Sequence, residues 1–287
     1  MSNASSLSWF VAAVTGVLVA APGMADEEPM YRAQKDSAEV IPLERAFAHN
    51  DYWHSRPLFD ALDRGFAFVE ADVFRVGDDM LVGHAEGELA PNLTLEGLYL
   101  DPLLERVREH GQVHPDGPET FWLMLDLKSP GEYTWPVLHE TLAEYEEMLA
   151  VVRDGTLNAG PVRVVISGDR PIGMMREEET LYAGVDGRLT DLDSDDPPYF
   201  MPWISGHWFR HFDWDGQGAM PAGEREKLAD IVEQVHESGR MLRFWATPED
   251  PDLWTVLLEH DVDMLNTDHL DRLQEFLLEA DATLTGD

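Results

Sequence analysis

The feature that most limits the fold of this chain is a regular alternation of short apolar runs with amphipathic segments between residues 43 and 280. Runs such as FAFVEADVF, FWLMLDLK and VRVVIS have the length and the aromatic or β-branched content of buried strands. Strands that alternate with helices predict a parallel sheet covered by helices. We expect strands at 45–49, 66–74 (extended by 80–84), 121–128, 162–167, 181–185, 200–205, 241–246 and 264–267, and helices at 57–64, 95–109, 134–152, 171–178, 222–238, 251–260 and 270–280.

About eight strands in one stretch, with no Pro/Ser-rich linker between them, are typical of a (β/α)8 TIM barrel. We therefore predict a single barrel domain at 43–280. A doubly wound open sheet is the alternative fold. The sequence contains no Gly-rich GxGxxG or GxxxxGK[ST] turn, so a dinucleotide site or a P-loop has no support.

The first 25 residues contain no Asp, Glu, Lys or Arg. A mostly apolar run at 9–21 is followed by Pro-Gly-Met-Ala, as in a secretory signal peptide, although its start has no basic side chain. The run is shorter than the roughly 20 residues of a membrane span. We expect a signal peptide at 1–25, a flexible lead-in at 26–42, an exported protein and no transmembrane span in the mature chain; a disordered or membrane-tethered N-terminus is the alternative.

Composition narrows the classes of function. The chain has 56 acidic against 20 basic residues, a net charge of −36, and no cysteine. A nucleic acid partner is disfavoured because counterion release needs a basic face, and disulfides, thiolate metal sites and thiol catalysis are excluded. Strong negative charge with only three lysines is typical of halophile-like proteins, whose self-repulsion is screened by salt. We expect a monomer.

Polar side chains end several of the expected strands, which is where barrel enzymes place their functional residues. Glu70 and Asp72 are two apart, so they point to the same face of one strand. Two buried carboxylates on one face repel each other, and a divalent cation with hard oxygen ligands, Mg²⁺ or Ca²⁺, would remove the conflict. The alternative is that one of them pairs with an arginine or lies at a solvated strand end.

Asp126 and Lys128 repeat this spacing at the end of another apolar run. A buried lysine is costly without an anion beside it. The pair is either a structural ion pair or a third metal carboxylate next to a cation for a substrate phosphate.

Two histidines, His49 and His84, also follow apolar runs. A lone histidine there is usually structural. Two of them around three carboxylates suit general acid–base chemistry, because unperturbed imidazole titrates near pH ~6.5.

The order H-N, E-x-D, G-H, D-x-K resembles the superfamily of glycerophosphodiester phosphodiesterases and phosphatidylinositol-specific phospholipases C. The stretches HNDYWHSRPLFDALDRGFAFVEADVF, VVISGDRP, RFWATPEDPDLW and DMLNTDHLDRL are similar to the branch that includes the altered-inheritance-of-mitochondria group, over about residues 43–278. The resemblance implies a (β/α)8 barrel with one divalent cation and a small-molecule or lipid phosphodiester as substrate.

Carried over residue by residue, the resemblance implies that His49 and His84 are the acid–base pair and that Asn50, Glu70, Asp72 and Asp126 hold the cation. Lys128 would face the phosphate, and Trp245 would line the alcohol pocket unless it only packs in the core. The chain departs from glycerophosphodiesterases in having Asn50 where an arginine is usual, Ala85 where an aspartate follows the histidine, and Asp126 where a glutamate is usual. We leave Asp51, Tyr52 and Trp53 as residues that shape the first loop.

Two rival functions remain open. One is a barrel that binds a metal and a phosphate but has lost catalysis, as the missing acidic residue after His84 suggests. The other is a glycoside hydrolase that uses two of the carboxylates, which would leave both histidines without a role.

Overall fold

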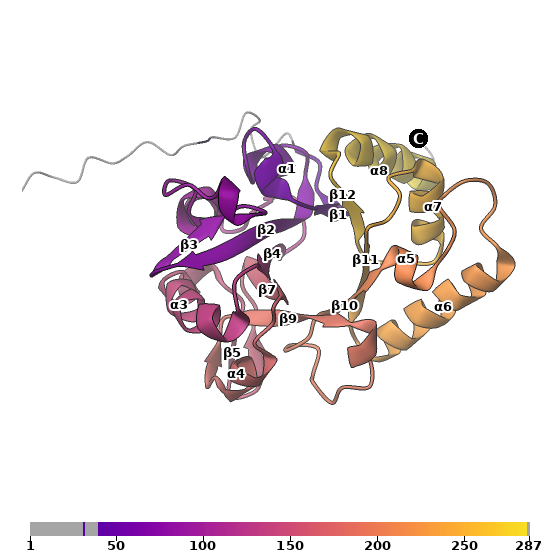
Figure 1. Ribbon diagram of the computed structural model, residues 1–287. Helices are drawn as coiled ribbons and strands as arrows, with labels where there is room; N and C mark the ends of the chain where they lie inside the picture. Colours follow the sequence, from indigo (N-terminus) through magenta and orange to yellow (C-terminus); the bar gives the residue numbers. More distant parts are fainter. Residues whose placement is uncertain (1–30, 32–39, 286–287) are drawn as a thin grey trace, which may run out of the picture.

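The computed structural model describes residue 31 and residues 40–285. Eight parallel strands form a nearly closed barrel, which confirms the predicted fold class (Figure 1). Their order in the sheet is β11-β10-β9-β7-β4-β2-β1-β12. The two ends meet through a parallel bridge between Arg243 and Met264. The strands are β1 (Leu43–Ala48), β2 (Phe66–Val76), β4 (Phe121–Leu127), β7 (Val162–Gly168), β9 (Ala183–Arg188), β10 (Trp203–His207), β11 (Met241–Trp245) and β12 (Leu265–Thr267).

Helices cover the outside of the barrel (Figure 1). The longest ones have an apolar face toward the strands and an acidic face toward solvent, as a surface helix requires. The helices are α1 (Phe59–Leu62), the π-helical turn η4 (Glu96–Leu100) with α2 (Asp101–His110), α3 (Gly131–Glu144), α4 (Ile172–Glu177), α5 (Trp208–His211), α6 (Ala222–Glu237), α7 (Pro251–Glu259) and α8 (Leu270–Thr285). Within the described residues, no helix is long and apolar enough to cross a membrane.

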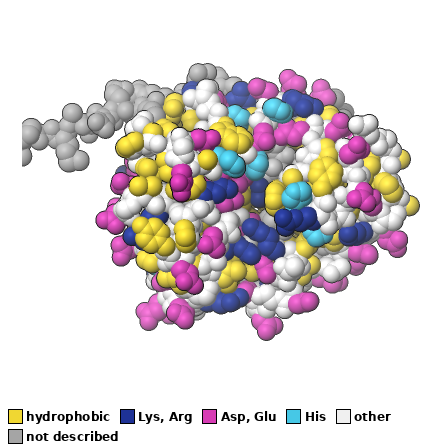
Figure 2. Space-filling model, in the orientation of Figure 1, with side chains coloured by type: hydrophobic (Ala, Val, Ile, Leu, Met, Phe, Trp, Pro, Cys, Tyr) yellow, Lys and Arg dark blue, Asp and Glu magenta, His cyan; other side chains and the backbone are white. Residues whose placement is uncertain are grey.

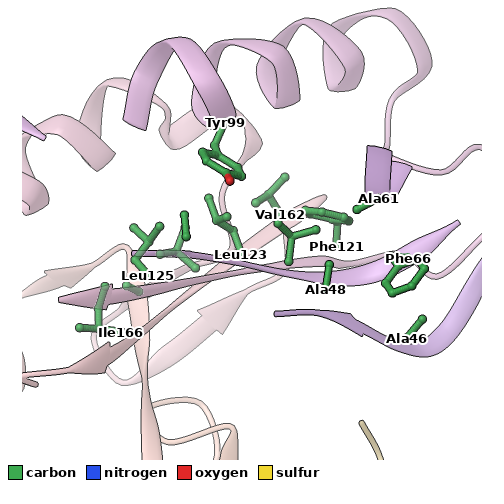
Figure 3. Packing of buried hydrophobic residues seen from close by; sticks show 14 of the residues in the cluster. Ala46, Ala48, Ala61, Phe66, Tyr99, Phe121, Leu123, Leu125, Val162 and Ile166 are labelled. Carbon is green, nitrogen blue, oxygen red and sulfur yellow. The ribbon is translucent and has the colours of Figure 1, made fainter. Parts of the chain in front are cut away.

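The core has two layers because side chains alternate along each strand. On the outer side of the sheet, Leu123 and Val162 lie under the ring of Tyr99 (Figure 3). Inside the barrel, Phe47 and Phe68 stack with their ring centroids 5.9 Å apart. The interior of the barrel is therefore filled mainly with apolar side chains below the C-terminal ends of the strands.

Two predicted elements are wrong in part. The helix expected at 134–152 ends at Glu144; the chain then forms β5 (Val151–Arg153), which pairs with β6 (Thr156–Asn158) and β8 (Thr180–Leu181) in a small second sheet. The extension of the second strand is an antiparallel hairpin between β2 and β3 (Asp79–Val82). Periodicity could not reveal either, because short strands and helix ends share the same apolar pattern.

The expected signal peptide at 1–25 lies outside the described residues. The same holds for most of the lead-in at 26–42.

Candidate active site

Strand register brings the carboxylates together. Asp72 on β2 lies directly opposite Asp126 on β4, and Glu70 lies opposite Met124. One oxygen from each of the three acids lies within 4.8 Å of the other two. Glu70 and Asp72 are buried, and burial raises the pKa of both Glu70 and Asp126. The predicted carboxylate cluster therefore exists at the mouth of the barrel.

Two basic side chains partly neutralise this cluster. Lys128 Nζ is 3.1 Å from Asp72 Oδ2 and 3.3 Å from Asp126 Oδ1. The guanidinium of Arg243 is 3.2 Å from Glu70 Oε2, so Glu70 has the arginine partner that the sequence left open as the alternative. When His49 and His84 are neutral, three ionised carboxylates against these two cations leave one negative charge over, and buried charge without a partner is costly.

The oxygen atoms at this place fit a hard divalent cation. Asp72 Oδ1 is buried and has no hydrogen-bond partner among the described residues, whereas Asp72 Oδ2 is fully occupied. Asn50 Oδ1 lies close by, because it contacts the same Tyr52 hydroxyl as Asp72 Oδ2. Carboxylate and amide oxygens are the ligands that Mg²⁺ and Ca²⁺ prefer. The bare oxygen and the surplus negative charge together make these residues a fitting cation site.

His49 follows β1 and is oriented by a carboxylate that follows the neighbouring strand, β12. Its Nδ1 is 2.7 Å from Asp268 Oδ1, just after β12, and its Nε2 is 3.6 Å from Glu70 Oε2. Burial alone lowers the pKa of His49, but Glu70 and Asp268 outweigh burial and raise it above 6.5. Asn50 Nδ2 donates to the same Asp268 oxygen at 3.2 Å.

His84 reaches the site because the β2–β3 hairpin turns back on itself. The backbone N–H of Gly83 donates to Asp72 O at 3.1 Å, which places the next residue at the barrel mouth. His84 Nδ1 lies 2.8 Å from Asp72 Oδ2. The carboxylate that is missing at position 85 is therefore supplied by Asp72, from the neighbouring strand.

Tyr52, which we expected only to shape the first loop, lies in contact with the predicted site residues. Its hydroxyl lies 2.7 Å from Asn50 Oδ1, 2.7 Å from Asp72 Oδ2 and 3.2 Å from His84 Nδ1. The sequence offered no signal for it beyond its position two residues after Asn50. Its neighbour Asp51 does shape the loop as expected: this fully buried carboxylate accepts hydrogen bonds from Leu58 N and Tyr99 OH, and burial raises its pKa to about 7.

Most of the predicted site residues line one cavity of about 340 Å³. In the face seen in Figure 2, histidine, lysine and arginine side chains gather around a central hollow. The predicted residues His49, Asn50, Glu70, His84, Asp126, Lys128 and Trp245 all line it, and Asp72 lies behind them. A hollow of about 400 Å³ behind Asp268 is larger, but Arg64 and Asp271, two of its basic and acidic side chains, already pair at 2.6 Å. The predicted site residues therefore gather in the smaller cavity.

The cavity is also lined by three polar residues that the sequence did not single out, Ser167, Asp186 and Arg188. Buried Asp186 accepts hydrogen bonds from Ser167 Oγ at 2.7 Å and from the guanidinium of Arg188. Trp245 packs edge-on against His207, with ring centroids 4.4 Å apart. Arg188 is thus a fixed positive group, and Trp245 a fixed aromatic one, in the lining of the cavity.

Comparison with known proteins agrees with the fold. The family model described as an AIM6-like phosphodiesterase domain matches residues 34–183, just over half of the chain. The altered inheritance of mitochondria protein 6 homolog of Arthroderma benhamiae is 26% identical over 85% of this chain and 87% of its own length. The altered inheritance of mitochondria protein 6 of Saccharomyces cerevisiae is 28% identical over 82% of this chain and 71% of its own.

Two solved structures are similar in fold. A calcium-dependent phosphoinositol-specific phospholipase C from a Pseudomonas species superposes with a TM-score of 0.52 at 12% identity, over 78% of this chain and 88% of that one. A glycerophosphodiester phosphodiesterase from Parabacteroides distasonis superposes with a TM-score of 0.50 at 14% identity. The match covers 83% of this chain and 98% of that one. At these identities the likeness is one of fold alone.

Proposed function

Because the chain belongs to the family of AIM6-like phosphodiesterase domains, we propose that it cleaves a phosphodiester of the glycerophosphodiester or phospholipid type with one divalent cation, Mg²⁺ or Ca²⁺. The observation that carries the proposal is the matched orientation of the two histidines. Each has a carboxylate oxygen on Nδ1, at 2.7 Å for His49 and 2.8 Å for His84. Each imidazole therefore presents Nε2 as its reacting nitrogen, as an acid–base pair requires.

In this proposal Asn50, Glu70, Asp72 and Asp126 hold the cation. When bound, it would neutralise a nonbridging phosphate oxygen and lower the pKa of the attacking hydroxyl. One histidine removes the proton from that hydroxyl, which belongs to water or to the substrate itself. The oxygen bonds to phosphorus, the bond from phosphorus to the leaving alcohol breaks, and the other histidine gives its proton to that alcohol.

The remaining cavity residues position the substrate. Lys128 faces the cavity, and its charge stabilises the additional negative charge on the phosphoryl oxygens in the transition state. Trp245 and Arg188 form the wall where the alcohol part would lie. A substrate hydroxyl as nucleophile would give a cyclic phosphate, and water would give the open phosphate ester.

The two rival functions have less support. A glycosidase would use two carboxyl groups and leave both histidines without a role, whereas the carboxylates here are paired with Lys128 and Arg243 and both histidines are oriented by carboxylates. The main reason to suspect lost catalysis was the missing acid after His84, and Asp72 takes that place. We also propose that the protein is exported and monomeric, on the N-terminal apolar run and the repulsion expected from its charge.

The test is an assay of purified protein on glycerophosphodiesters and phosphatidylinositol, with Mg²⁺ or Ca²⁺ and with EDTA. We expect turnover that EDTA abolishes and that the variants His49→Ala and His84→Ala each lose. Absence of turnover on every phosphodiester, or turnover indifferent to EDTA, would overturn the proposal. Ligand-induced thermal stabilisation without turnover would favour the binding protein, and glycosidase activity that survives both substitutions would favour the hydrolase.

A further inference from the structure

Tyr52 has an unusual set of partners. Its hydroxyl is within 2.7 Å of Asn50 Oδ1 and of Asp72 Oδ2, on two residues assigned to the cation site, and within 3.2 Å of Nδ1 of the acid–base residue His84. It is thus the one side chain described here that touches both the proposed cation ligands and His84 without being assigned to either group.

The contacts of Asp72 show what this hydroxyl does. Asp72 Oδ2 is approached by Tyr52 OH, His84 Nδ1 and Lys128 Nζ, at 2.7, 2.8 and 3.1 Å. Asp72 Oδ1 is buried and has none of these partners. Three donors on one oxygen fix the rotation of the carboxylate and leave Oδ1 as the bare oxygen of a residue that lies within reach of Glu70 and Asp126.

The loop does not need the Tyr52 hydroxyl for its shape. Tyr52 lies in the short turn η2 (Asp51–Trp53), and Asp51 already fastens this turn. The Asp51 carboxylate accepts from Leu58 N at the far end of the loop and from Tyr99 OH on η4. A phenyl ring at position 52 would keep the packing of the turn and lose only the polar contacts.

We propose that Tyr52 is a positioning residue that prepares the cation site and aligns His84 at the same time. Its one O–H donates to Asp72 Oδ2, the stronger acceptor of its two oxygen neighbours, and so holds that carboxylate with Oδ1 free, while its contact with Nδ1 limits the rotation of the His84 ring. The inference rests on the proposed function for its catalytic half, while its cation-binding half stands independently of any substrate. Groups behind the metal ligands commonly change cation affinity or activity about 10- to 100-fold when removed.

The test compares Tyr52→Phe with Tyr145→Phe. Tyr145 is a matched control because its hydroxyl also donates to an aspartate, Asp101, at 2.6 Å, but outside the cavity. Calorimetric titration of the metal-free proteins with CaCl2 and MgCl2 measures cation affinity. The unfolding temperature without cation shows whether each variant is stably folded. The kinetic constants kcat and KM are measured at saturating cation. We expect Tyr52→Phe to unfold at nearly the wild-type temperature, to bind cation about tenfold or more weakly, and to lose kcat more than KM. Tyr145→Phe should match wild type in affinity and kcat.

Each other outcome counts against the inference. Cation affinity within twofold of wild type, or tighter, would overturn it. So would a Tyr52→Phe protein that fails to fold while Tyr145→Phe folds, because the hydroxyl would then be structural. If wild type binds neither cation, the inference fails together with the cation site. If wild type binds cation but turns over no phosphodiester, the proposed function fails, and the affinity comparison still decides the role of Tyr52.

Discussion

Replacing Asp268 with Asn tests whether His49 depends on a carboxylate at the end of the neighbouring strand, β12. The change keeps the size of the side chain and removes its charge. Asp268 Oδ1 is 2.7 Å from His49 Nδ1, a distance typical of a charge-assisted hydrogen bond. Such bonds contribute about 1.5–3 kcal/mol. The Asp268 side chain is 46% exposed, so we take the lower half of that range.

A loss of about 1.5–2 kcal/mol corresponds to about a 10- to 30-fold lower kcat/KM. The pH profile should move as well. The carboxylates of Glu70 and Asp268 raise the pKa of His49, so loss of one charge lowers that pKa. Whether His49 acts as the base or the acid, the limb of the profile that it governs then shifts to lower pH.

The assay is the pH dependence of kcat/KM at saturating cation, with Asp271→Asn as the control. Asp271 lies three residues further on, is 74% exposed and pairs with Arg64, away from the cavity. Activity of Asp268→Asn within twofold of wild type, or an equal loss in Asp271→Asn, would refute the reasoning.

Further outcomes follow from the same structure. Cation at about 100 times its Kd should add about 2.7 kcal/mol to the free energy of unfolding, or about 5–10 °C in Tm; an unchanged Tm by calorimetry would contradict the site. Asp126→Asn should weaken cation binding at least about tenfold by titration, and unaltered affinity would remove Asp126 from the ligands. Trp245→Ala should raise KM about tenfold, which corresponds to a loss of ~1.4 kcal/mol of aromatic contact with the substrate. A fall in kcat with KM unchanged would contradict a role of Trp245 in the alcohol pocket. Burial lowers the pKa of His114 from 6.5 to about 4, so the unfolded chain binds a proton that the folded one does not. The free energy of unfolding should therefore fall by roughly 3 kcal/mol as the pH is lowered between these values. His114→Gln should flatten that slope in denaturant titrations, and an unchanged slope would contradict this assignment.

The predicted strands and the candidate residues on them were accessible because each depends on a local pattern. The two-residue spacing of Glu70 and Asp72, and of Asp126 and Lys128, fixes which face of a strand a side chain occupies. Neighbouring parallel strands then bring such faces together, as the pairing of Asp72 with Asp126 shows. Wherever the pattern was ambiguous, as at the end of α3, the prediction failed.

The sequence by itself determined the barrel, the acidic cluster at its mouth and the two histidines beside it. This is because the period of apolar side chains and the order of strands specify which residues share a face and an edge. Only the tertiary structure decided the partners of those residues: Asp268 on His49, Asp72 on His84, Arg243 on Glu70, and Tyr52 between the two halves of the site. The partners in these pairs are 12 to 219 residues apart in the sequence. The contact of Tyr52 with Asn50, two residues away, is the local one. Hydrogen bonds act over about 3 Å, so contacts between distant positions are fixed by how the barrel closes and leave no periodic trace in the sequence.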